Sequence, residues 1–255
     1  ALLNESFVMI HIRSSIEVDR IHVSGQIVKE TLEMLEEYIK PDAETLELDS
    51  LAEKFIRNQG AIPGFKGLYG FPATLCISID DEVVHGIPGK RILKKGQIVS
   101  IDVGAYKDNY YGDHARSFAV GNISKAKQQL LDVTRESLYK GIEQAIPGNR
   151  IGDIGHAVQK HAEKYGYGVV RQLVGHGIGT KLHEEPQIPN FGKKGTGAKI
   201  EAGMCFAIEP MINMGTPDVY TKEDNWTVCT QDNKPAAHFE HTITITNNGP
   251  RILTN

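Results

Sequence analysis

A pair of helices that occurs twice, at a constant separation, limits the fold of this chain more than any other feature. The first pair is expected over residues 15–40 and 46–58, and the second over 124–146 and 151–165. At an offset of 106 residues Pro41 matches Pro147 and Gly60 matches Gly166, and the second helices also match at an acidic and an apolar position. The pattern predicts two similar α/β halves, residues 14–120 and 121–250, that face each other. The alternative is a coincidence between two helices that each follow a proline.

Strand-like segments follow each helix pair. They are expected over residues 74–79, 97–103 and 110–120, and then over 169–174, 204–208 and 239–246, with a polar loop at 215–225. Active sites commonly lie in a cavity between two such halves. We expect residues 9–255 to form one domain and residues 1–8 to be a leader, because Met9 would make a natural start.

Composition and charge argue against several classes of protein. The net charge is −4 with no basic block, so the sequence predicts no nucleic-acid partner. No apolar run is long enough to span a membrane, and the N-terminus does not resemble a signal peptide. Cys76, Cys205 and Cys229 are far apart and odd in number, which favours reduced thiols and a cytoplasmic location.

Two aspartates lie in neighbouring strands. Asp102 lies within an apolar run, between Ile101 and Val103, and Asp113 lies in the strand that follows. If Lys107 and Asp108 form a two-residue hairpin loop, the aspartates are directly opposite, with Cβ atoms about 5 Å apart on one face. The two like charges would repel, and a divalent cation between them would remove the conflict. A one-residue shift in register would separate their faces, and two solvent-exposed acids are the alternative reading.

Other acids and histidines lie in contexts that suit a ligand. Glu209 ends a second apolar run, and Glu240 is expected on a strand face shared with Thr242 and Thr244. A buried acid is costly unless it is paired or binds a metal. Three histidines lie in segments that are rich in glycine or bounded by proline, where the backbone could bring an imidazole close to a ligand, although each alone is weak evidence: His85, His176 and His183.

Together these residues offer four carboxylates and one imidazole: Asp102, Asp113, Glu209, Glu240 and His176. This set suits a pair of divalent ions such as Co, Mn, Fe or Zn. No thiolate belongs to it, so a structural zinc site is not expected. Two ions bridged by carboxylates, about 3.5 Å apart, are typical of hydrolysis by a metal-bound hydroxide.

The order of the motifs resembles that of type I methionine aminopeptidases over residues 16–254. The motifs are Cys76-Ile77-Ser78-Ile79, Val84-His85-Gly86-Ile87-Pro88, Ile101-Asp102-Val103, Gly112-Asp113, Gly175-His176-Gly177-Ile178-Gly179, His183-Glu184-Glu185-Pro186, Ala207-Ile208-Glu209-Pro210 and Glu240-His241-Thr242. The resemblance implies the pita-bread fold, an α/β (α+β) architecture with antiparallel sheet around a central dinuclear metal site. It also implies a single-domain metalloaminopeptidase that removes the initiator methionine from nascent proteins and prefers a small second residue.

The resemblance assigns a role to each candidate residue. Asp113 and Glu240 would bridge two divalent ions, Asp102 would complete one, and His176 with Glu209 would complete the other. A bridging hydroxide would attack the peptide bond, with Glu209 exchanging the proton. His85 and His183 would contact the substrate. The methionine pocket would be lined by Phe65, Leu68, Phe71, Cys76, Leu182 and Trp226.

The resemblance is to the short, bacterial-type branch, because the chain has neither a Cys/His-rich N-terminal extension nor a long insertion before the last strands, and an organellar enzyme is the alternative. It implies a cytoplasmic monomer that meets nascent polypeptide N-termini near the ribosome. One position departs from the family pattern, since His114 follows Asp113 where relatives usually have threonine. On a strand His114 would face away from Asp113, so we do not count it as a ligand.

Three other functions fit parts of the pattern. A proline-directed peptidase of the same fold shares the ligands but usually carries a further N-terminal domain. A metal-free binding protein could keep the fold, although retention of all five ligand-type residues argues against it. A non-haem iron oxygenase needs two histidines and one carboxylate on one face, and only one histidine here is expected to accompany the acids.

Overall fold

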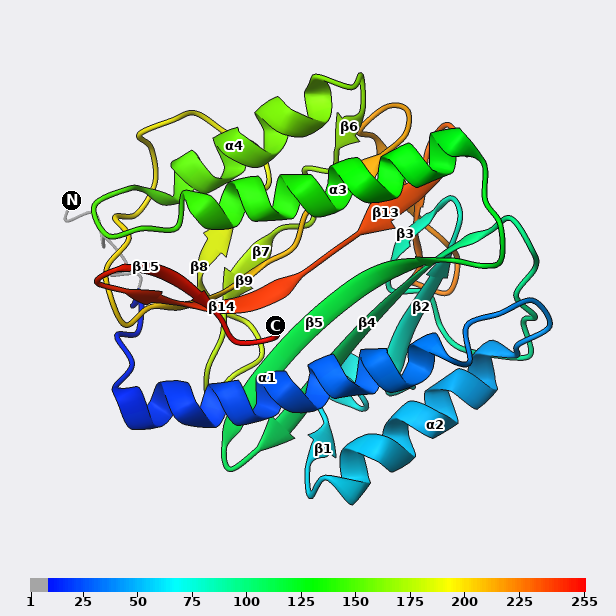
Figure 1. The fold of residues 1–255 in the computed structure, drawn as a ribbon, viewed down its shortest axis with the longest axis horizontal. Coiled ribbons are helices and arrows are strands. Elements are labelled where there is room, and N and C mark those ends of the chain that lie inside the picture. The colour runs from blue at the N-terminus through cyan, green and yellow to red at the C-terminus, as the bar shows by residue number, and fades with distance from the viewer. Residues whose placement is uncertain (1–8) are drawn as a thin grey trace, which may run out of the picture.

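The computed structural model describes residues 9–255, so the leader predicted at residues 1–8 lies outside the described part. Four long helices follow the predicted segments: α1 (Ser15–Glu36), α2 (Thr45–Asn58), α3 (Lys125–Glu143) and α4 (Ile151–Glu163). In Figure 1, α1 and α2 border the strands on one side, and α3 and α4 border them on the other. No helix within residues 9–255 is both long enough and apolar enough to cross a membrane.

The two helix pairs begin and end in equivalent ways. Ser14 and Glu17 form a capping box at the start of α1, and the Ser124 side chain caps α3. Each short helix is followed by a glycine in the left-handed region, Gly60 with φ of 70° and Gly166 with φ of 76°. The 106-residue offset therefore relates residues with the same backbone conformation. α1 ends at Glu36, short of its predicted end near residue 40.

The strands fall into two sets along the chain. The first comprises β1 (Ile62–Pro63), β2 (Leu75–Ile79), β3 (Glu82–Val84), β4 (Ile98–Lys107) and β5 (Tyr110–Ala119), with a short 3-10 helix, η1 (Leu68–Gly70). The second comprises β6 (Gly168–Val169), β7 (Gly175–Gly177), β8 (Glu184–Ile188), β9 (Cys205–Ile208), β10 (Met211–Asn213), β11 (Val219–Thr221), β12 (Val228–Thr230), β13 (Ala236–His238), β14 (His241–Thr246) and β15 (Gly249–Ile252).

Three strand predictions were wrong in detail. Of the strand expected over residues 169–174 only Val169 lies in a strand, β6, and pairing resumes just beyond that range in β7; the polar loop expected at 215–225 contains β11. The strand expected from residue 239 is interrupted, so Glu240 lies between β13 and β14 rather than within a strand. Glycines and polar residues at these points break the apolar pattern, and tertiary contacts decide where pairing resumes.

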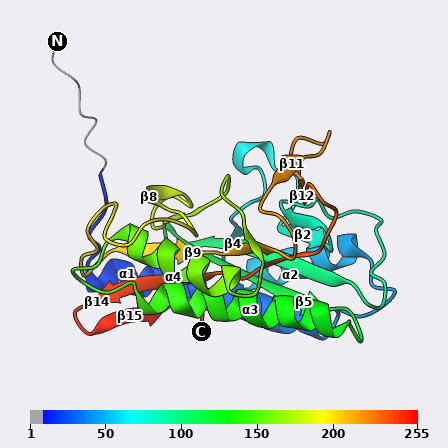
Figure 2. The same cartoon turned by 90° about the horizontal axis from the view of Figure 1, so that it is seen from above.

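Antiparallel sheets carry the two halves. One sheet has the order β1-β4-β2, with β5 paired to β4, and another has the order β15-β14-β9-β7-β8. Apolar residues of α1 and α2 pack on the first sheet, and those of α3 and α4 pack on the second, so two separate cores are formed. Figure 2 shows β8, β11 and β12 rising on the side of the sheets away from α3. The candidate site lies on that side.

The loop of the hairpin between β4 and β5 lies one residue further along the chain than predicted. It is formed by Asp108 and Asn109, both with positive φ, and not by Lys107 and Asp108. Two consecutive residues with positive φ are typical of a type I′ hairpin turn, for which Asp and Asn are well suited. Asp102 therefore pairs with Ala115, and Asp113 pairs with Gly104. The predicted direct pairing was wrong, but the register moved by two residues, so both aspartates still share one face.

The two halves meet along a seam between β5 and residues 238–242. The Glu240 N–H donates to the Ala115 carbonyl at 2.9 Å. On either side of this hydrogen bond, side-chain hydroxyl groups bond to backbone groups of the facing segment. The Thr242 hydroxyl bonds to both the N–H and the carbonyl of Asp113, at 3.1 and 2.7 Å, and Ser117 bonds to both backbone groups of His238, at 2.8 and 2.9 Å. The seam therefore fixes residues from distant parts of the chain beside one another.

Candidate metal centre

All five residues predicted as ligands reach one buried region between the halves. Asp102 comes from β4, Asp113 from β5 and His176 from β7, while Glu209 follows β9 and Glu240 precedes β14. Their relative exposure is low, at 9% for Asp102, 3% for Asp113, 7% for His176 and 0% for Glu240. The alternative of two solvent-exposed acids is therefore wrong.

The donor atoms are close enough to share ions. The ligand atoms of Asp113, His176 and Glu240 lie within 4.8 Å of one another, and so do those of Asp102, Glu209, His238 and Glu240. His176 Nε2 is 3.4 Å from both Asp113 Oδ2 and Glu209 Oε1. Two donors at about 2.1 Å from one tetrahedral ion would be about 3.4 Å apart. Glu240 belongs to both groups and can therefore contact two neighbouring ions.

Four buried carboxylate oxygens support a metal at this place. Asp102 Oδ1, Asp113 Oδ1 and both oxygens of Glu240 have no hydrogen-bond partner among the described residues. A buried carboxylate oxygen without a partner is costly. Divalent cations would satisfy all four oxygens and offset the repulsion between the acids. The residues present thus fit the metal that their composition predicts.

The acids and histidines of this cluster strongly shift one another's pKa values. Burial, followed by the charges of Asp113 and Glu209, raises the pKa of Asp102 well above its ordinary value, and the pKa of Glu240 is raised for the same reasons. Burial also opposes ionisation of Glu209, but hydrogen bonds from His176 and His238 outweigh it and lower its pKa to about 2. Burial opposes protonation of His176, yet hydrogen bonds to Asp113 and Glu209 raise its pKa to about 10. Such opposed shifts in one cluster are typical of functional sites.

Glycine on either side of His176 is required by close packing. A Cβ at Gly175 would lie 2.4 Å from the Ala207 carbonyl oxygen, and one at Gly177 would lie 2.2 Å from that of Glu185. Both neighbours are backbone atoms that cannot move aside easily. The glycines therefore let β7 fit between β8 and β9, and this places His176 beside Glu209.

Sequence reasoning missed one histidine of the cluster. His238 is 1% exposed, and its Nε2 lies 3.0 Å from Glu209 Oε2. The expectation that only one histidine accompanies the acids was therefore wrong. The available signal was its position two residues before Glu240, which places both side chains on one face of an extended segment. Within this segment, the sequence pattern indicated only Glu240 as a candidate ligand.

An apolar cavity of about 200 Å³ adjoins the acids. Its lining includes the six residues predicted to form the methionine pocket, namely Phe65, Leu68, Phe71, Cys76, Leu182 and Trp226. Phe71 and Trp226 pack edge to face, with ring centroids 5.1 Å apart. The structure thus brings all six together beside the acids, while their role in binding methionine stays a prediction.

The two histidines expected to contact substrate line the same cavity. His183 packs edge to face against His176, with centroids 4.5 Å apart, and His85 lies among the other lining residues. Burial lowers the pKa of His85, which favours its neutral form. His85 has a φ of 62°, an uncommon conformation for a residue other than glycine, and such strain clusters at functional sites.

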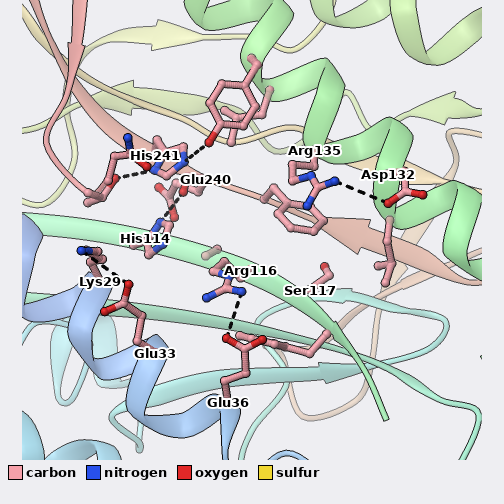
Figure 3. Close-up of a pocket in the computed structure, with 18 of the residues that line it drawn as sticks. Lys29, Glu33, Glu36, His114, Arg116, Ser117, Asp132, Arg135, Glu240 and His241 are labelled. Atoms are coloured by element: carbon pink, nitrogen blue, oxygen red, sulfur yellow. Dashed lines mark hydrogen bonds and ion pairs between the residues drawn. The ribbon is translucent and has the colours of Figure 1, made fainter. Parts of the chain in front are cut away.

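His114 faces away from the acids, as expected. It lines a groove of about 470 Å³ on the other side of the seam, between α1 and α3, where its Nδ1 bonds to the Glu240 carbonyl (Figure 3). Its ring stacks on His241 at 4.9 Å. Ion pairs border this groove in Figure 3, among them Arg116 with Glu36 at 3.3 Å and Arg135 with Asp132 at 3.7 Å.

Comparisons with known proteins agree with the geometry. The model of metallopeptidase family M24 matches residues 19–247. A methionine aminopeptidase from Clostridium acetobutylicum is 52% identical over 247 residues, which cover 96% of this chain and 99% of that protein. The crystal structure of a methionine aminopeptidase from Thermotoga maritima superposes with a TM-score of 0.95 at 42% identity, covering 97% of this chain and 100% of that one.

A more distant likeness bears on the proline-directed alternative. Prolidase from Pyrococcus furiosus superposes with a TM-score of 0.79 over 96% of this chain and 65% of that one. The two sequences are only 22% identical, so this likeness shows a shared fold alone.

Proposed function

The chain belongs to metallopeptidase family M24, has its pita-bread fold and is a methionine aminopeptidase that removes the initiator methionine; we propose that it does so with two divalent ions. The observation that carries the proposal is the set of buried carboxylate oxygens without partners, on residues from both halves. Asp102, Asp113, His176, Glu209 and Glu240 would hold the ions. Mn, Fe, Co and Zn all suit this mixture of carboxylate and imidazole.

We propose that Glu240 bridges the two ions, because its oxygens belong to both groups of ligand atoms. The resemblance gives Asp113 the same role. The His176–Glu209 distance supports these two as ligands of one ion, and Asp102 would serve the other. When bound, the ions would supply a water acidified enough to act as the nucleophile at neutral pH.

The protein's own side chains would then manage the proton and the substrate. Glu209 would accept the proton of the attacking water and return it to the leaving amine. His183, at the mouth of the cavity, would polarise the scissile carbonyl, and His85 would hydrogen-bond near the scissile nitrogen. The apolar cavity lined by these histidines would hold the methionine side chain. The family resemblance implies a preference for a small second residue.

The substrates would be nascent polypeptide N-termini, met near the ribosome by a cytoplasmic monomer. The three buried cysteines are unpaired, which supports a reducing compartment. Nothing specific to this site favours the proline-directed alternative, since that likeness extends only to the fold.

The direct test is release of free methionine from Met-Ala-Ser, measured with the purified protein in the presence of Mn, Fe, Co or Zn. We expect release only with added metal, and none from Asp102→Ala or His176→Ala even with excess metal. Near-normal turnover in both variants would contradict the ligand assignment. Cleavage of an Xaa-Pro dipeptide in preference to Met-Ala-Ser would contradict the proposed substrate.

A further inference from the structure

A second cavity continues the one that holds the candidate metal centre. It has a volume of about 700 Å³ and shares Val174, His176 and His183 with the smaller apolar cavity. Its outer lining includes Lys181, Glu185 and Gln187, which are all exposed. The two cavities therefore adjoin each other beside His183.

One wall of the second cavity is preformed. The Glu184 carboxylate accepts hydrogen bonds from Arg13 at 2.8 and 2.7 Å, and from the Thr180 hydroxyl and the Lys181 N–H at 3.3 and 3.2 Å. The side chains of Arg13 and Glu184 are each only 6% exposed. Both Glu184 oxygens accept from the same nitrogen, Arg13 Nη2, while Arg13 Nη1 donates to Glu17 in α1, so the buried arginine ties the loop before β8 to α1. These bonds attach the loop between His176 and β8 to Arg13 and fix its conformation beside the cavity.

The same cavity offers groups that suit an extended polypeptide. Lys181 and Glu185 form no ion pair with any residue of the described chain, so both charges are available. β8, which starts at the residue after His183, is one of the two edge strands of its sheet within residues 9–255. An uncovered strand edge exposes backbone groups, and peptides are commonly recognised along such edges.

The size of the inner cavity determines where the rest of a substrate must go. About 200 Å³ can accept one large side chain but not a continuing polypeptide. We propose that the second cavity binds the residues that follow the second residue of the substrate, and that Lys181 and Glu185 sense the charge of those residues. This inference rests on the proposed function, because it requires the amino-terminal residue to lie in the inner cavity.

The test compares substrates of different length and charge. The kcat/KM value for Met-Ala-Glu-Glu is divided by that for Met-Ala-Lys-Lys, and methionyl-alaninamide, which ends before the second cavity, is measured in parallel as a substrate that cannot reach it. Lys181→Glu should lower the ratio of the acidic to the basic tetrapeptide by about two- to fivefold, and Glu185→Lys should raise it by a similar factor, as expected for exposed charge pairs. The effects should shrink in high salt.

Lys54→Glu is the matched control, because Lys54 is an exposed, unpaired lysine on α2, outside both cavities. If Lys181→Glu and Glu185→Lys change the ratio of the acidic to the basic tetrapeptide no more than Lys54→Glu does, the second cavity does not bind the downstream residues. The inference also fails if both variants shift the ratio in the same direction. Either result would leave methionine release intact, whereas failure of the proposed function would abolish release from every peptide with every metal.

Discussion

The two sides of the seam between the halves use neighbouring residues for opposite purposes. On one side, Asp113 and Glu240 have buried oxygens without partners. On the other, His114 and His241 are stacked and hydrogen-bonded, His114 to the Glu240 carbonyl and His241 to Tyr139 and Thr254. Asp113 and His114 are consecutive in sequence, and so are Glu240 and His241. The comparison teaches that one pair of extended segments carries an electrostatically strained face and a satisfied face, because side chains alternate along them.

The pKa shifts express the same contrast. Burial and nearby negative charge raise the pKa of Glu240 and leave its ionised form in need of a cation. Burial, followed by the positive charge of Arg116, lowers the pKa of His241 to about 4, so this histidine is neutral. The acidic side is therefore organised for a ligand, while the histidine side already has its partners.

The largest difference between the two sides is expected when one residue on each side is replaced by glutamine, which has a neutral amide side chain. Glu240→Gln should reduce methionine release by about 1,000-fold or more, because a lost ion removes several kcal/mol of transition-state stabilisation. His114→Gln should reduce it far less, since the amide can still donate to the Glu240 carbonyl. Both are measured with Met-Ala-Ser at saturating metal. Comparable losses in the two variants would show that the sides are not functionally distinct.

Substitutions at His238 test whether metal binding on the acidic side depends on the hydrogen bond between His238 and Glu209. His238→Ala should weaken metal binding by about 10- to 100-fold, as removal of groups that orient a metal ligand usually does. His238→Gln should recover part of this loss, because its amide can donate to Glu209 Oε2. Isothermal titration with Mn and Co measures both affinities. Wild-type affinity in His238→Ala would exclude the role.

A substitution at His241 tests the histidine side of the seam through the pH dependence of the free energy of unfolding. Since its folded pKa of about 4 lies below the ordinary value of 6.5, the unfolded chain binds a proton that the folded chain does not. Its contribution to stability is present above pH 6.5 and lost as pH falls toward 4, amounting to about 2 kcal/mol between pH 7 and 5. His241→Gln should flatten this decline by that amount. Urea unfolding with a chelator present measures it, and an unchanged pH slope would contradict the prediction.

Thr242 tests the seam itself. Thr242→Val removes the hydroxyl that bonds to both backbone groups of Asp113, and leaves a buried N–H without its partner. We expect a loss of about 1–2 kcal/mol in the free energy of unfolding. Thr246→Val is a suitable comparison, because that hydroxyl bonds only within a partly exposed turn. Equal effects of the two substitutions on urea unfolding would argue against a special role for the seam.

Much of the fold was predictable because local signals agreed with tertiary structure. Capping at Ser14 and Ser124, and the glycines after α2 and α4, mark helix ends by local backbone chemistry. Strand interruptions were harder to predict, because a break such as that before β14 depends on contacts with β5 across the seam. The hairpin loop was misplaced because Lys107, Asp108 and Asn109 are all compatible with a turn, and only the pairing of β4 with β5 selects two of them.

The sequence by itself determined the kinds of side chain available at the site: four acids in apolar surroundings and histidines beside glycine. Their spacing along the chain also carried the family resemblance that implied methionine removal. Only the tertiary structure decided which groups meet. It brought His238 to Glu209, left four carboxylate oxygens without partners, and opened a second cavity beside His183. The physical reason is that these contacts join segments separated by many residues, whose proximity depends on the packing of both halves and not on local preference.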